Sequence, residues 1–392
     1  MRRVRLLLIA LAATLAGAAP ASAAVTPIDL GPGIEPSVVV DPAGTAHVLY
    51  LPGLVGAPQY CRLPRGATAC DVRAALGDSD DIEQVQILRR DSDGVLIAVG
   101  RAGNRLWIAF SSDGGASFVP AGWNPAEVGL AETITLAPGG QSVFAWNAGR
   151  PGQTGILLAN AAFGAPDLRY TVLQDGSTPA AGEARVATLP DGRIMAGTTW
   201  SGGLSWNLFA GGDALDPSRW IKRGHLKEFS PDVDFAAGPR GLFMVERTTT
   251  RLRKDPVDAP PLYLRTFDLK RNRWSRASGI FADRGGPYDE IRAAQDASGR
   301  LHVLTSVTND LCLMYSRTGP KRRSGFGKTN VLVRRALRPA EPELAVAPDG
   351  GGAVVWQEYD RTTDQTRVWA APLQAAKGKY RRVDPARWKG CR

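Results

Sequence analysis

Long hydrophobic runs, histidine and cysteine are scarce in this chain of 392 residues, and each scarcity excludes a class of protein. Beyond the N-terminal segment, no stretch approaches the roughly 18 consecutive apolar residues that a membrane-spanning helix needs. Three histidines without ligand spacing argue against a catalytic zinc site. The sequence also lacks a nucleophile elbow, a phosphate-binding loop, a dinucleotide fingerprint and a metal-binding cysteine pair. The common catalytic and nucleotide-binding motifs are therefore excluded.

The N-terminal segment has the three parts of a secretory signal. Arginines at positions 2, 3 and 5 precede an uncharged apolar segment at residues 6–19, and residues 21–23 are small, as a signal peptidase requires. The apolar segment is short for a spanning helix, so a membrane anchor is the weaker interpretation. We predict a signal peptide over residues 1–23 and a single exported domain over residues 24–392.

One pattern recurs seven times in the rest of the chain: an acidic residue, a short apolar strand, a tight turn that contains glycine, and a second apolar strand. The first copy is EPSVVVDPAGTAHVLY, from Glu35, and the last is EPELAVAPDGGGAVVW, from Glu341. The turn glycines, 46 to 58 residues apart, are Gly44, Gly94, Gly140, Gly192, Gly241, Gly299 and Gly350. A period in this range is typical of propellers and solenoids.

A second pair of candidate strands lies in each repeat, for example RLWIAF before SSDGGASF. Four strands per unit is the composition of a propeller blade, so we predict an all-β, seven-bladed β-propeller of four-stranded blades. The segment VTPIDL, from Val25, is a candidate for the strand that completes the last blade and closes the ring, and YRRVD near the C-terminus is the alternative.

Four cysteines in an exported chain predict two disulfides, with three possible pairings. We favour Cys61–Cys70, which falls on the outer strands of the first predicted blade, where a cross-strand disulfide is geometrically reasonable. The second pair would be Cys312–Cys391, which would tie the C-terminal tail to the sixth blade.

SSDGGASF resembles the Asp-box, or BNR repeat, of the sialidase-like β-propellers. Ser111, Asp113, Gly115 and Phe118 match the box, with Phe where that family has Trp. The resemblance implies that the box is a structural turn on the face away from an active site, so Asp113 should staple a turn. It also gives two alternatives: a six-bladed propeller of the sialidase type, and a divergent glycoside hydrolase of the exo-α-sialidase type.

The catalytic set of that family is only partly matched. Sialidase chemistry needs three arginines, a tyrosine nucleophile with a glutamate partner, and an aspartate acid/base, but no tyrosine here stands in a matching context. Arg185 and Arg292 each lie two residues after an acidic repeat residue, hence on the same face of the strand. The hydrolase alternative predicts two carboxylates and at least two arginines in one pocket of the channel mouth.

The acidic residue at the head of each repeat is the most regular feature. If the repeated strands are innermost, these residues would circle one mouth of the channel: Glu35, Glu83, Glu132, Glu183, Asp232, Glu290 and Glu341. In a structural interpretation, each carboxylate accepts backbone N–H hydrogen bonds from the neighbouring inter-blade loop. In a functional one, the carboxylates bind Ca²⁺ or a cationic ligand. No calcium-type loop is present, so we expect no metal or other cofactor.

Aromatic and histidine residues also recur at matched positions. Four aromatic residues are candidates for a ligand-side rim that stacks on sugar rings, with wedges between blades as the alternative: Tyr50, Trp146, Trp200 and Trp356. His47 and His302 each lie three residues after their turn glycine, and we predict that they are buried structural residues.

The charge balance suggests the surroundings of the protein. The formal net charge of +10 falls to +7 without the three signal-peptide arginines, which favours anionic surroundings such as wall polymers. No nucleic-acid-binding motif is present. We therefore expect a monomeric, non-catalytic binding protein for a glycan, a cell-envelope polymer or a protein partner, with no nucleic-acid partner and no membrane span.

Overall fold

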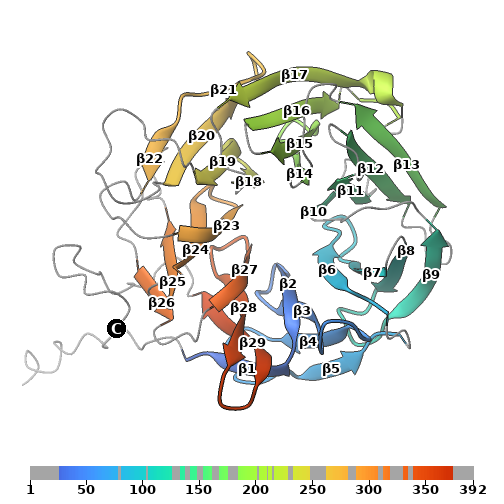
Figure 1. Cartoon of the computed structure of the whole chain (residues 1–392), viewed down its shortest axis with the longest axis vertical. Coiled ribbons are helices and arrows are strands. Elements are labelled where there is room, and N and C mark those ends of the chain that lie inside the picture. The colour runs from blue at the N-terminus through green and yellow to red at the C-terminus, as the bar shows by residue number, and fades with distance from the viewer. Residues whose placement is uncertain are drawn as a thin grey trace, which may run out of the picture.

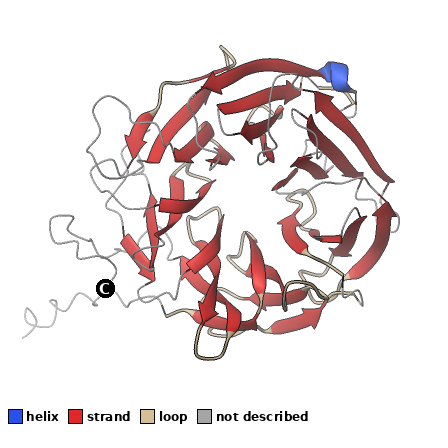
Figure 2. Ribbon diagram, viewed as in Figure 1, coloured by secondary structure: helices blue, strands red, loops and turns tan. Residues whose placement is uncertain are grey.

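The protein is an all-β propeller in the computed structural model, with radial sheets arranged around a central channel (Figure 1). The described part of the chain is almost entirely strand, with one short 3₁₀ helix, η1 (Pro217–Arg219) (Figure 2). No helix among the described residues is long and apolar enough to cross a membrane. The structure describes residues 26–77, 81–102, 105–125, 133–136, 142–147, 153–160, 167–174, 184–200, 203–209, 211–213, 216–227, 233–247, 262–280, 288–307, 312–317, 330–333 and 339–373.

The described strands form seven antiparallel sheets, each with its innermost strand beside the channel. The first three sheets, from the channel outward, are β2 (Ile34–Val40), β3 (Ala46–Leu51), β4 (Gln59–Leu63) and β5 (Val72–Ala75); β6 (Gln84–Arg89), β7 (Leu96–Ala102), β8 (Arg105–Ser111) and β9 (Val119–Pro125); and β10 (Thr133–Leu136), β11 (Ser142–Asn147), β12 (Gln153–Asn160) and β13 (Asp167–Gln174).

The other four sheets follow the same order. They are β14 (Ala184–Thr188), β15 (Ile194–Trp200), β16 (Gly203–Phe209) and β17 (Trp220–Lys227); β18 (Val233–Gly238), β19 (Gly241–Arg247), β20 (Leu262–Asp268) and β21 (Arg273–Trp274), with β22 (Ser278–Ile280) also on β20; β23 (Tyr288–Gln295), β24 (Leu301–Val307), β25 (Cys312–Arg317) and β26 (Asn330–Val333); and β27 (Pro339–Val346), β28 (Gly352–Asp360), β29 (Gln365–Leu373) and β1 (Ile28–Pro32).

Strand β1 closes the ring. It pairs antiparallel with β29, with Ile28 opposite Ala370, so the N-terminal candidate for ring closure is confirmed. Two side chains of the first sheet also hold this strand, because the Tyr50 hydroxyl and the Arg73 guanidinium both donate to the Leu30 carbonyl. The alternative, YRRVD, lies outside the described residues.

Apolar side chains fill the spaces between neighbouring sheets. Leu49 and Tyr60 of the first sheet, for example, share a cluster with Leu96 and Trp107 of the second. Each sheet thus buries its two faces against its two neighbours, which a single four-stranded unit cannot do alone. Full burial of one such aliphatic side chain contributes about 2 kcal/mol.

The Cys61–Cys70 disulfide is confirmed. It closes the loop that follows β4, and Arg65 in that loop forms an ion pair with Asp349 of the last sheet. The loop thus helps to join the first and last sheets of the ring. The second predicted disulfide lies outside the described residues, because it involves Cys391.

Both matched histidines are buried, as predicted. His47 is hydrogen-bonded to Tyr60 through Nδ1, at 2.7 Å, and Nε2 lies 3.8 Å from Asp41. His302 is fully buried, with Nε2 3.3 Å from Asp296. In both repeats the aspartate precedes the histidine by six residues and caps the same turn.

The turn at residues 111–118 is stapled by its own side chains. The Asp113 carboxylate accepts hydrogen bonds from the Ser111 hydroxyl and from the backbone N–H and hydroxyl of Ser117. Phe118 packs edge-on against Tyr60. Because strands alternate in direction, this turn after the third strand lies at the end opposite the start of the innermost strands. Asp113 therefore has the predicted turn role.

Candidate functional site

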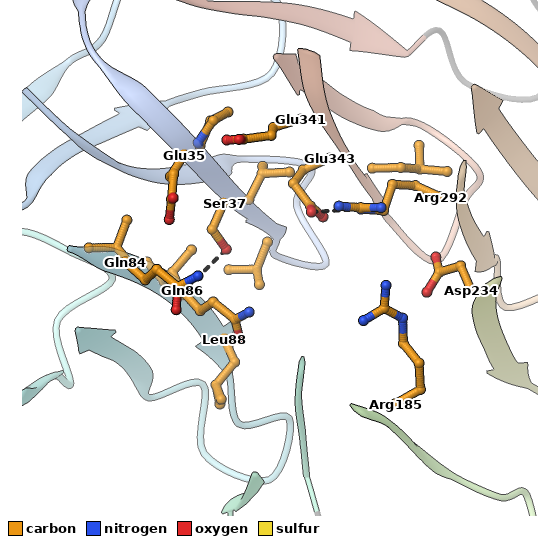
Figure 3. A pocket seen from close by; sticks show the side chains of 16 residues that line it. Glu35, Ser37, Gln84, Gln86, Leu88, Arg185, Asp234, Arg292, Glu341 and Glu343 are labelled. Atoms are coloured by element: carbon orange, nitrogen blue, oxygen red, sulfur yellow. Dashed lines mark hydrogen bonds and ion pairs between the residues drawn. The ribbon is translucent and has the colours of Figure 1, made fainter. Parts of the chain in front are cut away.

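A cavity of about 410 Å³ lies in the channel at the end where the innermost strands begin, which we call the channel mouth. Its described lining comes from six innermost strands and is dominated by polar and charged side chains (Figure 3). Bulged strand starts and the links between sheets meet at this end of the ring, so loops can vary here without disturbing the sheets.

The floor of the cavity is a ring of side chains at one shared strand position. In each innermost strand, this position lies three residues before the last residue of the strand. The residues at this position are Ser37, Gln86, Arg185, Arg292 and Glu343, and Asp234 lies at the same level of its own strand. In sheet order, the last four sheets present Arg185, Asp234, Arg292 and Glu343. Positive and negative side chains therefore alternate around this half of the ring (Figure 3).

Arg292 is held between two carboxylates. Its Nε donates to Glu343 Oε1 at 2.7 Å, and its Nη1 donates to the Ile291 carbonyl. Burial alone would lower the pKa of Arg292, but Glu343 and Asp234 outweigh it and raise the pKa above its ordinary value. This guanidinium is therefore permanently charged and fixed in orientation.

Asp234 lies between the two arginines. Its Oδ2 accepts a hydrogen bond from the Ala293 N–H at 2.6 Å, so it caps an edge of the next innermost strand. Burial raises the pKa of Asp234 to about 6, against the opposing effect of Arg292 and Arg185. Arg185 is buried as well, and its Nε donates to the Val233 carbonyl, beside Asp234. The floor is thus cross-linked from sheet to sheet.

Glutamates at the heads of the repeats lie above this floor. Glu35 and Glu341 line the cavity, and Glu290 lies behind Glu341. The Glu290 carboxylate lies next to the Glu341 backbone, and the Glu341 carboxylate lies next to the Glu35 backbone. The Glu35 N–H donates to the side-chain oxygen of Gln357 at 2.7 Å. The structural interpretation of the acidic ring, in which each carboxylate accepts backbone hydrogen bonds, stays a prediction.

Burial and mutual repulsion raise the pKa values of these glutamates above the ordinary value. Burial is the largest cause in each case, and it raises the pKa of Glu290 and of Glu341 to about 7. It also raises the pKa of Glu35, which Arg101 opposes. Repulsion from neighbouring carboxylates also raises these pKa values: Glu341 raises the pKa of Glu290, and Glu35 raises the pKa of Glu341. A positive group placed among them would therefore favour the charged forms.

The backbone is strained at the same place. Glu35 has φ +50° and Glu341 has φ +49°, a left-handed conformation that glutamate rarely adopts. Each lies in an irregular step of its strand, between Ile34 and Ser37 or between Ala340 and Glu343. Such strain costs about 1–3 kcal/mol per residue and clusters at functional sites.

The predicted site residues divide into three groups. The structure brings Glu35, Glu341, Arg185 and Arg292 into one cavity. Glu83 forms an ion pair with Arg101 at 2.9 Å and is not among the residues that line the cavity. Glu290 is also described and is not among the lining residues. The other three members of the acidic ring lie outside the described residues: Glu132, Glu183 and Asp232.

The prediction of a rim of exposed aromatic side chains is wrong for Tyr50 and Trp356, the two members whose side chains are described. Tyr50 is buried beneath β1, and Trp356 is fully buried with its Nε1 donating to Glu358. Both lie on second strands, which are covered on both faces by neighbouring sheets, so they cannot stack on a ligand. The side chains of Trp146 and Trp200 lie outside the described part of the structure.

Sequence reasoning missed Asp234 and Glu343. Both lie two residues after a repeat head, at the step that singled out the two arginines. Reading that position through the repeats would have found all of the floor except Gln86, which lies three residues after Glu83. It would have found Ser37, whose hydroxyl accepts a hydrogen bond from the Ile87 N–H at 3.1 Å. Among the described residues, no group of three or more His, Cys, Asp or Glu side chains is placed to hold a metal ion.

Beneath the floor, the channel continues as a second cavity of about 680 Å³. The two cavities share Arg185, Asp234 and Leu344 in their linings. Valine and alanine side chains are frequent in the lower part, which is also lined by Arg89, Arg90 and Asp91. Carboxylates are more numerous at the mouth.

Comparison with known proteins defines the class of fold. No family model matches the chain, and no curated protein matches it. Among solved structures, Kuenenia stuttgartiensis hydrazine synthase is similar with a TM-score of 0.56 and 11% identity, over 93% of this chain and 99% of that one. The polysaccharide lyase Uly1 has a TM-score of 0.54 and 10% identity, over 87% and 90% of the two chains.

A third similar structure is YCF48 bound to a D1 peptide, with a TM-score of 0.52 and 12% identity, over 92% of this chain and 98% of that one. The three similar proteins differ in function, and their identity to this chain is low. The likeness therefore shows a β-propeller fold and leaves function to the site.

Proposed function

We propose that this chain is an exported, seven-bladed β-propeller that binds a polar ligand at its channel mouth without transforming it. The seven sheets in their ring order support the blade count. The signal-like residues 1–23 and the Cys61–Cys70 disulfide support export. The repeat architecture and the turn at residues 111–118 support a distant relation to the sialidase-like propellers.

The observation that carries the binding role is the composition of the cavity. Its volume of about 410 Å³ is within the range of small-ligand sites. Its floor presents fixed charges of both signs, and its wall presents strained glutamates that repel each other. The strained backbone of the wall costs free energy, and such strain is expected where a ligand supplies compensating interactions. A glycan, a cell-envelope polymer or a protein segment would each present suitable polar groups.

The sialidase-like hydrolase is the second candidate. Its predicted arrangement is present, because two arginines and several carboxylates share the cavity. The raised pKa of Glu341, about 7, would also suit a general acid. However, the described lining contains no tyrosine and no third arginine. Arg292 is already paired with Glu343. We therefore place this function second.

A binding screen with matched variants tests the proposal. Mature protein would be applied to arrays of soluble glycans, wall-polymer fragments and synthetic peptides, and each binder would be retested with Glu35→Gln/Glu341→Gln. We expect at least tenfold weaker binding, because the amide keeps the shape and removes the charge. Asp91→Asn, at the opposite end of the channel, is the control. Release of new reducing ends that depends on Glu341 would overturn the non-catalytic role in favour of the hydrolase.

A further inference from the structure

Three apolar side chains are exposed on the mouth side of two neighbouring blades. Leu54 is 83% exposed and Val55 is 54% exposed, both in the loop between β3 and β4. Tyr359 is 42% exposed, near the end of β28. Strand direction places both elements at the mouth, because β3 and β28 run from the turn end toward it. The other large apolar side chains exposed in the described part of the chain, Val119 and Ile221, lie on outermost strands.

The apolar loop is held in place on the C-terminal side of its tip. The Gly56 N–H donates to the Ile82 carbonyl of the second sheet, and the Leu76 N–H donates to the Pro58 carbonyl. Gly56 also packs close to Pro52, on the other side of the tip. Leu54 and Val55 are therefore exposed to solvent on a loop that is fixed in position.

Tyr359 is braced in a similar way. It lies in an extended hairpin, where it pairs with Thr366, and its hydroxyl donates to the Asp364 carboxylate. A tyrosine whose hydroxyl is fixed presents its ring as a rigid contact surface with little rotamer entropy left to lose. Aromatic residues of this kind are enriched in protein–protein interfaces.

One backbone segment joins the loop, the hairpin and the cavity. The Gly33 N–H donates to the Thr366 carbonyl in the hairpin, at 2.9 Å. A Cβ atom on Gly33 would lie 2.6 Å from the Leu51 carbonyl oxygen, at the start of the loop, so the chains are in tight contact there. Two residues later the same segment reaches Glu35, which lines the cavity. The apolar residues thus flank the acidic mouth.

We propose that this surface, Leu54, Val55 and Tyr359 together with Glu35 and Glu341, binds an extended segment of another protein. The inference rests on the proposed binding role of the channel mouth and specifies the ligand. A lysine or arginine side chain of the segment enters the mouth, where its positive charge relieves the repulsion between the two glutamates. Apolar side chains beside that residue cover Leu54, Val55 and Tyr359.

Other ligands fit the surface less well. A glycan would stack on Tyr359 but has no aliphatic side chain to cover Leu54 and Val55. A lipid surface would receive the apolar loop, but anionic headgroups would be repelled by the carboxylates of the mouth. A peptide with alternating apolar and basic residues meets both demands at once.

The test uses two synthetic libraries of fluorescein-labelled decapeptides. In one library a central lysine or arginine is flanked by leucine, isoleucine, phenylalanine and tyrosine, and in the other glutamate replaces the basic residue. Binding to the mature protein is measured by fluorescence anisotropy at low and moderate salt. We expect the basic library to contain binders that are at least tenfold tighter than their glutamate counterparts.

Variants assign the contacts. Leu54→Ser/Val55→Ser and Tyr359→Ala should each weaken these binders at least fivefold with an unchanged melting temperature, whereas Val119→Ser, an equally exposed apolar residue on the opposite side, should not. Glu35→Gln/Glu341→Gln should abolish the preference for the basic library. If the glutamate variants weaken binding but the apolar variants do not, the mouth binds ligands and the peptide surface is overturned. If neither set has an effect, the proposed binding role fails as well.

Discussion

The two ends of the innermost strands are built by different rules. At the turn end, left-handed backbone is given to glycines such as Gly44, Gly299 and Gly350, and aspartates cap the turns. At the mouth end, left-handed backbone is given to Glu35 and Glu341, and carboxylates face one another. The turn end therefore follows the preferences of the residues, and the mouth end violates them.

The difference separates stability from function within a single strand. Glycine in a left-handed turn is unstrained, whereas glutamate there costs about 1–3 kcal/mol. Two strained residues with elevated pKa values in one cavity are hard to explain by packing alone, since the same strands achieve regular packing a few residues away. Variants that change one end at a time test whether the turn end carries stability and the mouth end carries function.

The largest effect is expected at the turn end, for Asp296→Ala. Asp296 accepts hydrogen bonds from Ser298 and from the Arg300 N–H, and it contacts the buried His302. Removing the carboxylate leaves the buried His302 without this partner and the turn without its cap, so we expect a loss of about 3 kcal/mol in the free energy of unfolding. Chemical denaturation of the purified protein measures it.

Asp296→Asn is the matched control, because the amide oxygen can still cap the turn, and it should cost clearly less. A loss under about 1 kcal/mol for the alanine variant would mean that the turn end is not the stabilising end, and the comparison would fail.

The regular features of the structure were accessible from the sequence. The repeated glycine turns predicted the sheets and their order, and VTPIDL was a candidate for the closing strand that the structure bears out. Matched positions in two repeats predicted buried histidines, because side chains at matched depths in a repeat usually serve packing. The acidic residue before each turn located the channel mouth.

The irregular features were not accessible in the same way. Distance from a turn gives depth along a strand but not what covers the side chain, so Tyr50 and Trp356 were placed on a rim although sheets bury them. The floor was half missed because its charges alternate in sign, from Arg185 to Asp234, and a search for one residue type sees only half of such a ring. The bulges that aim Glu35 and Glu341 depend on pairing with the next strand.

A glycine exchanged between the two ends should have opposite effects. Gly241→Ala imposes φ +112° on a residue with a Cβ, although nothing lies within 4 Å of that atom, so the backbone alone should cost about 1–2 kcal/mol. Glu35→Gly relieves strain at the mouth and should stabilise the protein by about 1 kcal/mol relative to Glu35→Gln, which lacks the charge but keeps the strain. Thermal unfolding of the three variants measures both. Equal stability of the two Glu35 variants would show that the mouth is unstrained.

The smallest effect is a difference in pH dependence between the two ends. Burial lowers the pKa of His47 to about 4, although Asp41 acts to raise it. Between about pH 6.5 and 4 the unfolded chain binds this proton and the folded chain does not, so the turn end loses stability as the pH falls through this range. The pKa values of Glu290 and Glu341 are raised to about 7, so their contribution is present below about 4.5 and is lost as the pH rises through 7. The charges that face them are Glu35, Glu343 and Arg292.

We therefore expect hydrogen exchange at β27 and the start of β2 to quicken as the pH rises from about 4.5 to about 7, after correction for the intrinsic rate, and exchange at the Asp41 turn to quicken on acidification. Glu341→Gln should weaken this loss of stability without abolishing it, because Glu290 also contributes, and should raise stability at pH 8 by about 1 kcal/mol, a value discounted for partial exposure. Asp91→Asn should leave the profile as it is. Parallel pH profiles at the two ends would show that the carboxylates of the mouth are ordinary surface acids, and the reason for treating the mouth as a site would then rest on its strain alone.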